Sequence, residues 1–355
     1  MLKSKLFTAI ALVAALLLLV PAAYAATDST TGSFGAKAQP PVVESIQIYD
    51  ATTDLAVTSM TPQETYYAKL NITSVNKLKN LQEVKATIYY DQDGTHPAPV
   101  GGGNTQTQAI FKWRADGIPS EWQIDPSGGG TTWVLVTGSC THADVTGNLT
   151  NGDWRFYFEP GKVATEAPSV AHASAEWDAQ GLAQNKQDTW SAAKYLLADK
   201  TMAWYGEILL AAGTADWGDV DLGMVFSTEP PNPKPDVGLS INYIANGDYY
   251  EDVASEDWEF GTDTAALRED WSDNGNPPDA AGQFALKADN DATLADAVTV
   301  KKVTTEYVHI GDTGAQTTEA GADVANNKLW LTLSATGIYP GTYSGDIWFQ
   351  IAERP

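Results

Sequence analysis

Cysteine and histidine are scarce in this sequence, which excludes several kinds of cross-link and metal site. Cys140 is the only cysteine, so no disulfide can form within the chain. We interpret it as a buried or idle thiol, with pairing between chains as the alternative. The histidines lie at no metal-ligand spacing, so we expect surface or loop roles and neither a zinc nor a haem site. They are His96, His142, His172 and His309.

Basic residues are also few. The chain has 21 lysines and arginines against 45 aspartates and glutamates, for a formal charge of −24. This balance leaves no basic patch, so we expect no nucleic-acid partner. A strongly acidic surface favours solubility, cation binding or life in salty water, and composition leaves these three alternatives open.

Sequence motifs of catalysis are absent as well. The chain has no G-x-S-x-G elbow, no H-E-x-x-H, no C-x-x-C and no P-loop. A pair of carboxylates brought together in three dimensions could still act as in glycosidases, but so many acidic residues make such proximity uninformative. The sequence therefore predicts that the protein is not an enzyme, with an extracellular hydrolase as the third-ranked interpretation.

Long hydrophobic runs occur only at the N-terminus. Lys3 and Lys5 precede an apolar run over 6–20, and Ala23-Tyr24-Ala25 has the small-x-small pattern of a cleavage site. The run is shorter than the roughly 20 residues that cross a bilayer. We expect a cleaved signal peptide over 1–25, a secreted product, and no membrane span or anchor after cleavage.

The remainder of the chain shows the period-two alternation of β-strands. Runs of alternating apolar residues are separated by stretches rich in Gly, Pro, Asn and Asp, which is typical of antiparallel sheets. The fold class predicted is all-β, built of tandem antiparallel immunoglobulin-like β-sandwiches. Strands are expected within 42–50, 65–75, 83–90, 131–139, 152–164, 202–213 and the C-terminal 120 or so residues.

One segment is expected to be helical. Trp190, Ala193, Lys194 and Leu197 recur at helical spacing, and no β-branched residue follows Thr189 within 188–200. This predicts a short helix near 188–199 inside the first domain.

A proline-rich stretch divides the mature chain. Four prolines within six residues favour an extended path over 229–236. We therefore expect an extended N-terminal arm over 26–41, a first sandwich over 42–228 and a second over 237–355.

Two tryptophans interrupt the polar side of the last two predicted strands. Trp330 alternates with three leucines, and Trp348 alternates with Ile347, Phe349 and Ile351. If these strands pair as a hairpin, both indoles lie together on the solvent face, where two large aromatic groups favour contact with another subunit or a sugar ring. The alternative is that a loop or the first domain covers them.

Calcium is the metal that the acidic turns favour. Oxygen ligands at alternate positions of turns suit Ca²⁺, which accepts six to eight oxygens in irregular loops; the alternative is that Asp and Asn simply form the turns. The candidate ligands are Asp91, Asp93, Asp270, Asp273, Asp289 and Asp291.

Two sequons are candidates for glycosylation in an exported protein. They are Asn71-Ile72-Thr73 and Asn148-Leu149-Thr150. Asn71 falls on the polar face of its predicted strand, which is consistent with access to the modifying enzyme.

Two stretches carry a resemblance to known proteins. The C-terminal LWLTLSATGIYPGTYSGDIWFQI (329–351) resembles the closing hairpin of secreted immunoglobulin-like domains in archaeal and bacterial surface proteins. GDWRFYFEPGKVA (152–164) with SAEWDAQGLAQNK (174–186) looks like a strand pair of surface-layer-type archaeal proteins. The resemblance implies an extracellular β-sandwich protein of the cell envelope, and it implies no catalytic residue.

These observations favour one function and leave a rival. The first hypothesis is a structural protein that self-assembles into a surface layer, sheath or filament, through sandwich contacts and strand edges. The rival is a carbohydrate-binding or adhesive module that stacks polysaccharide on Trp330 and Trp348. The expected partner is therefore a second copy of the chain or a glycan.

Overall fold

The computed structural model describes 39–128, 130–210, 214–223, 239–270, 278–290, 296–318 and 322–354, with residues 31, 33 and 294. The predicted signal peptide, most of the N-terminal arm and the proline-rich linker lie outside these residues. Residues 38–355 form one compact unit. It contains two hydrophobic cores, each enclosed by its own sheets.

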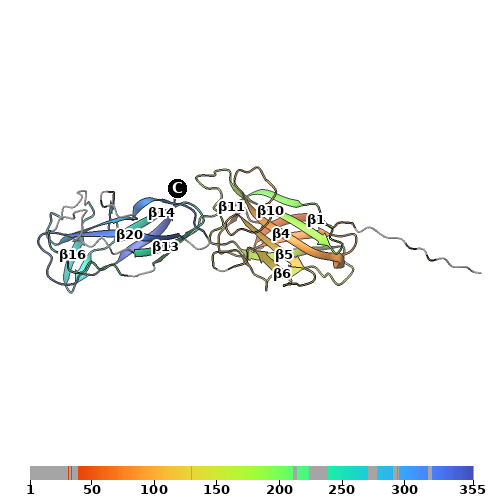
Figure 1. Cartoon of the computed structure of the whole chain (residues 1–355), viewed down its shortest axis with the longest axis horizontal. Helices are drawn as coiled ribbons and strands as arrows, with labels where there is room; N and C mark the ends of the chain where they lie inside the picture. The colour runs from red at the N-terminus through yellow and green to blue at the C-terminus, as the bar shows by residue number, and fades with distance from the viewer. Residues whose placement is uncertain are drawn as a thin grey trace, which may run out of the picture. The chain divides into compact units, whose positions relative to one another are not determined.

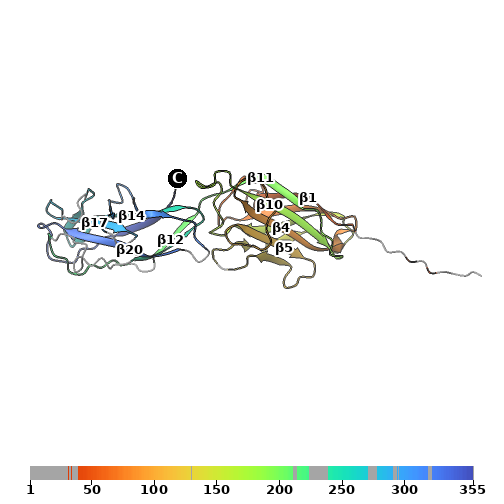
Figure 2. The ribbon, with the colours of Figure 1, turned by 45° about the horizontal axis from the view of Figure 1, so that its top comes forward.

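Two sheets enclose the first core. In the six-stranded sheet, β10 lies between β11 and β4, as Figure 1 and Figure 2 show. In order, its strands are β2 (Ser59–Met60), β11 (Lys194–Met202), β10 (Glu176–Asn185), β4 (Leu81–Asp91), β5 (Gln108–Arg114) and β6 (Trp122–Asp125). The five-stranded sheet has β1 (Val42–Asp50), β3 (Tyr66–Thr73), β9 (Asn151–Glu159) and β7 (Val134–Leu135) in order, with β8 (Thr141–His142) also paired to β9.

Alternation of side chains builds this core as the sequence predicts. On β9, Trp154, Phe156 and Phe158 are fully buried, and they pack beside aromatic residues of β5. On β10, Gly181 allows a close approach of the two sheets. A Cβ atom there would lie 3.0 Å from Leu70 and 3.1 Å from Val43, both on the opposing sheet. The absence of a side chain at Gly181 therefore leaves room for Leu70 and Val43 from the opposing sheet.

Two further sheets enclose the second core. The seven-stranded sheet runs β12 (Gly206–Leu210), β13 (Leu239–Ala245), β20 (Ala322–Leu333), β17 (Gln283–Asp289), β16 (Asp263–Leu267) and β15 (Trp258–Phe260), with β18 (Val298–Thr299) paired to β17. The three-stranded sheet runs β19 (Val308–Gly314), β14 (Tyr249–Ser255) and β21 (Ile347–Glu353). Buried residues of both sheets join in one cluster. β12 precedes the predicted linker, yet it pairs with β13 of this sheet.

The all-β prediction is confirmed, and the predicted helix near 188–199 is wrong. Among the described residues, the only helical element is the 3₁₀ turn Leu78–Asn80. Residues 194–199 of the segment instead belong to β11, which pairs antiparallel with β10. An isolated helix of about 12 residues is only marginally stable, because helix nucleation is unfavourable, whereas the edge of β10 supplies hydrogen-bond partners for a whole strand. No helix in the described part of the chain is long and apolar enough to cross a membrane.

Among the described strands, pairing is antiparallel with two short exceptions. β2 pairs in parallel with β11 through Thr201 and Met202. β16 pairs in parallel with β17 through Ala266 and Leu267. Each exception is two residues long, so the layered antiparallel architecture is retained.

A carboxyl group lies inside the second core. Glu251 of β14 is 4% exposed, and it accepts a hydrogen bond from the side-chain amide of Asn327. Burial raises the pKa of Glu251 to about 7 from its ordinary value of 4.5, against the opposing effect of its hydrogen bond with Tyr243. A carboxyl group that keeps its proton in the folded state favours folding at acid pH and opposes it once ionised.

The pH dependence of stability tests this group. The folded state holds the Glu251 proton between about pH 4.5 and pH 7 while the unfolded chain releases it, so stability falls as pH rises through this window. The change is of the order of 2–3 kcal/mol. Urea unfolding of Glu251→Gln should lose this component, whereas the exposed control Glu259→Gln should keep it. An identical pH profile for wild type and Glu251→Gln would contradict the assignment.

Candidate functional site

Four polar side chains converge on the outer face of the six-stranded sheet. They are Asp91, His96, Glu176 and Asp178. Each offers one atom that can bind a metal, a carboxylate oxygen or an imidazole nitrogen, and these four atoms lie within 4.8 Å of one another. Three are buried carboxylates, and His96 lies at the rim with a side chain that is 35% exposed. In the part of the chain that the structure describes, no other group of three or more such residues comes together in this way.

Strand register positions the carboxylates. Glu176 lies directly opposite Asp91, and Asp178 lies opposite Tyr89. Residues that alternate along a strand share one face, so both β10 carboxylates face the same side as Asp91. The intervening Trp177 is fully buried on the other side, in the core. The same strand pair thus supplies a hydrophobic layer on one face and a carboxylate cluster on the other.

A tight loop positions the histidine. Asp91 Oδ1 accepts backbone N–H bonds from Asp93 at 3.2 Å and Gly94 at 3.1 Å, and its Oδ2 accepts the His96 N–H at 2.6 Å. Gly94 has φ +68°, and a Cβ atom there would lie 3.1 Å from the carbonyl oxygen of Ser174. Glycine is therefore needed where the loop turns back toward β10.

The His96 ring lies among all three carboxylates. Its Nδ1 is 2.8 Å from Glu176 Oε1, 3.1 Å from Asp178 Oδ2 and 3.6 Å from Asp91 Oδ2. The hydrogen bond to Asp178 raises the pKa of His96, with further support from the charges of the neighbouring carboxylates. Burial raises the pKa of Asp178, although contact with His96 opposes this effect. Imidazole nitrogen and carboxylate oxygen together form a donor set that can hold a metal ion.

The predicted calcium ligands lie in different environments. Asp91 belongs to the cluster, whereas Asp93 is exposed and accepts hydrogen bonds from Thr95. Asp270 is exposed and pairs with Arg268 at 2.9 Å. Asp289 is buried on β17, opposite Lys328 of β20. Asp273 and Asp291 lie outside the described residues.

Sequence reasoning missed His96, Glu176 and Asp178. His96 lies in a loop with a partly exposed side chain, as expected, and the fold brings three carboxylates to it from other segments or across a turn. One signal was present: Glu176 and Asp178 are separated by one residue in an expected strand, which places both on one face. The pairing of β4 with β10 cannot be read from the sequence.

The predicted tryptophan pair does not form. Trp330 is 5% exposed and packs in the second core. Its strand β20 pairs with β13 and β17, whereas Trp348 lies on β21 beside β14. The hairpin assumption failed because the two strands belong to different sheets. Trp348 is half-buried, on the face of β21 opposite Phe349, which packs against the second core.

The two sequons differ in environment. Asn71 lies within β3, where its side-chain amide donates to Asp153 at 2.7 Å and to Asn151 at 3.2 Å. Asn148 lies in an exposed loop, where its side-chain oxygen accepts a hydrogen bond from Lys77. Of the two, Asn148 therefore offers the more accessible amide.

Cys140 is half-buried beside β9. The backbone N–H of Tyr157 lies 3.3 Å from its Sγ. Burial raises the pKa of the thiol to about 11, so it stays protonated and unreactive at neutral pH.

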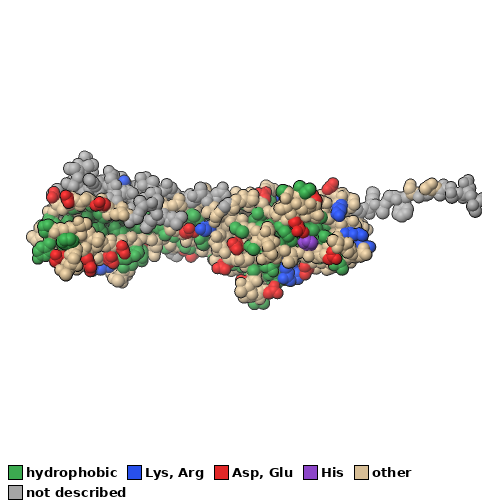
Figure 3. All heavy atoms as spheres, turned by 90° about the horizontal axis from the view of Figure 1, so that it is seen from below, with side chains coloured by type: hydrophobic (Ala, Val, Ile, Leu, Met, Phe, Trp, Pro, Cys, Tyr) green, Lys and Arg blue, Asp and Glu red, His purple; other side chains and the backbone are tan. Residues whose placement is uncertain are grey.

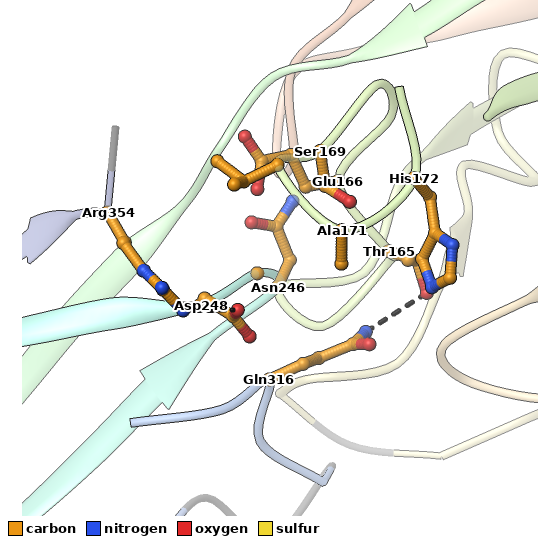
Figure 4. Close-up of a pocket in the computed structure, with 11 residues that line it drawn as sticks. Thr165, Glu166, Ser169, Ala171, His172, Asn246, Asp248, Gln316 and Arg354 are labelled. Atoms are coloured by element: carbon orange, nitrogen blue, oxygen red, sulfur yellow. Dashed lines mark hydrogen bonds and ion pairs between the residues drawn. The ribbon is translucent and has the colours of Figure 1, made fainter. Parts of the chain in front are cut away.

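A small hollow contains two further carboxylates. Figure 4 shows Glu166 and Asp248 at this hollow, with Arg354 beside Asp248. The Asp248–Arg354 distance is 3.5 Å, and burial, followed by the neighbouring Glu353, raises the pKa of Glu166 to about 7. The hollow has a volume of about 140 Å³, well below the roughly 300 Å³ and more of typical ligand pockets. It does not have the dimensions of a sugar-cleaving cleft.

Comparison with known proteins assigns no family. No protein-family model matches the sequence, and no curated protein matches it. Among solved structures, a crystal structure of dimeric latent PorU from Porphyromonas gingivalis is similar at a TM-score of 0.11 and 9% identity. The match covers 89% of this chain and 34% of that protein, so this chain spans about a third of its length.

Substitution of the two tryptophans distinguishes core from surface. Trp330→Ala should destabilise the protein by about 3–5 kcal/mol, because it leaves a cavity in the second core. Trp348→Ala should cost less than about half of that, because its indole is half-buried outside the core. Both changes in the free energy of unfolding are measured from the shift of the urea midpoint, with the slope m of free energy against urea concentration unchanged. Similar losses for the two variants would contradict the assignment.

Proposed function

We propose that this chain is an extracellular structural protein whose copies associate through exposed sheet edges. We further propose that each pair of sheets is an immunoglobulin-like sandwich and that residues 1–25 direct export. The proposal rests chiefly on one observation, the unpaired apolar edge of β11. It is also supported by the absence of catalytic sequence motifs and by the predicted signal peptide.

The β11 edge has the chemistry of an association site. β10 pairs with one side of this strand, whereas β2 pairs on the other side only with Thr201 and Met202. No described strand pairs with residues 194–199 on that side. Tyr195 and Leu197 of this stretch are 37% and 44% exposed. An unpaired edge with apolar side chains favours the addition of a strand from another chain.

A second edge lies at the start of β1. The turn after β1 covers its C-terminal end, where Val57 donates its backbone N–H to Ile48. Residues 42–47 pair only with β3 among the described strands. The predicted arm 26–41 directly precedes this edge, so we propose that the arm of one copy adds as a strand to an open edge of another.

The acidic surface is consistent with this mode of assembly. Figure 3 shows acidic side chains spread over the visible face, with fewer basic ones. With a formal charge of −24, copies repel one another at low ionic strength. Salt or divalent cations would weaken this repulsion and let the edges approach.

Leu197→Lys tests the edge mechanism. A lysine on an edge strand disfavours pairing between chains, so this variant should remain monomeric at concentrations where the wild type forms larger species. Light scattering after size exclusion, with and without Ca²⁺, gives the mass. Val100→Lys is the matched control, because Val100 is 81% exposed in a loop. A wild type that is strictly monomeric at high concentration under both conditions contradicts the proposal.

A second candidate function is carbohydrate binding on the three-stranded sheet. Trp348, Asp252 and Gln350 share one face by register, and Gln350 donates to Asp252 at 3.1 Å. On the same face, the rings of Tyr250 and His309 stack at 4.2 Å, and the His309 side chain is 58% exposed. Aromatic faces beside a carboxylate and an amide suit sugar rings and their hydroxyls.

Tryptophan fluorescence tests this candidate. A polysaccharide that stacks on Trp348 should quench the emission, and Trp348→Ala should abolish the quenching. Trp190→Ala, which removes an indole that is 37% exposed on the other pair of sheets, should retain it. A broad panel of glycans that leaves the emission unchanged would contradict carbohydrate binding at this face.

A further inference from the structure

We infer that Asp91, His96, Glu176 and Asp178 form a binding site for one divalent transition-metal ion of the Mn²⁺, Fe²⁺ or Zn²⁺ class. This site is independent of the proposed self-association, since it lies on the outer face of β4 and β10 and involves no second copy.

The distances match those of a metal's ligands. Ligands bound at about 2.0–2.2 Å in a tetrahedral arrangement lie about 3.3–3.6 Å from one another. The contacts of His96 Nδ1 with the three carboxylates span 2.8 to 3.6 Å, and all four ligand atoms lie within 4.8 Å. Small movements of side chains would place an ion at their centre.

A second observation points to a missing ligand. Asp178 is 0% exposed, and its Oδ1 lacks a hydrogen bond of normal geometry although it is fully buried. The hydroxyl of Tyr89 lies near the carboxyl group of Asp178, but it too lacks a hydrogen bond of normal geometry. A buried carboxylate oxygen without a partner is costly in free energy. Direct coordination of an ion by this carboxylate would remove that cost.

Charge also favours a cation at this point. The three carboxylates carry up to three negative charges, and His96 supplies at most one positive charge. Buried charges of one sign need compensation, and a divalent ion supplies what the imidazole does not. The partly exposed His96 side chain at the rim provides a route by which the ion enters.

The donor set favours a transition metal over calcium. Ca²⁺ takes six to eight oxygen ligands, whereas this cluster supplies one imidazole nitrogen and three carboxylates. Imidazole suits Zn²⁺ and Fe²⁺, and carboxylates suit Mn²⁺. The structure thus revises the sequence-based expectation of Ca²⁺ at Asp91.

Titration calorimetry of the metal-free mature protein with Zn²⁺, Mn²⁺ and Ca²⁺ tests the site. We expect one equivalent of Zn²⁺ or Mn²⁺ to bind at least tenfold more tightly than Ca²⁺ and to raise the melting temperature. Co²⁺ should give the intense visible absorption of a low-coordinate site. His96→Ala and Asp178→Asn should each weaken binding at least tenfold, and circular dichroism verifies that both variants fold.

His309→Ala is the matched control, because His309 is another histidine in contact with a carboxylate, Asp252. This variant should bind the metal as the wild type does. The proposal is overturned if no ion binds, if Ca²⁺ binds more tightly than Zn²⁺ and Mn²⁺, or if His96→Ala and Asp178→Asn leave binding unchanged. Should Asp178→Asn fail to fold, His96→Ala at the exposed rim decides the outcome alone.

Discussion

The antiparallel pairing of β4 with β10 is the constraint on which the first half of the molecule depends. Its register runs from Glu176 opposite Asp91 to Asn185 opposite Leu81. Because side chains alternate between faces, this one register fixes two layers together. Trp177 and its small neighbours meet the opposing sheet, and Glu176 and Asp178 meet Asp91 on the outside. A slip by one residue would bury the carboxylates in the core and expose the tryptophan.

Both cores combine extensive apolar burial with a few polar groups held in place by neighbours. In the first, the polar groups lie on the outer face of the sheet, under a loop that Asp91 itself organises. In the second, Glu251 lies inside and depends on Asn327 and Tyr243 for its hydrogen bonds. Such groups cost free energy unless they are satisfied. A change of register would separate these polar groups from their partners. They therefore favour one register more strictly than hydrophobic packing alone does.

Local patterns predicted the strands well because alternation reflects burial directly. β1 begins and ends where the sequence indicates, and the inward set of β9 is correct. Patterns failed where tertiary pairing decides. Residues 188–199 have helical spacing, yet 194–199 pair with the edge of β10. Trp330 was expected at the surface, but β20 lies between two strands distant in the sequence and the indole packs in the second core. Of the four cluster residues, the sequence predicted only Asp91 as a metal ligand. The others come from a loop and from a strand about 85 positions further along the chain.

A crystal structure of the protein soaked in Zn²⁺ tests the β4–β10 account most directly, since the electron density shows the strand register and the anomalous difference map shows the ion. The account predicts one strong peak about 2.0–2.2 Å from His96 Nδ1 and from oxygens of the cluster carboxylates, with Glu176 opposite Asp91. A map with no peak there, or strands paired in a different register, would contradict it.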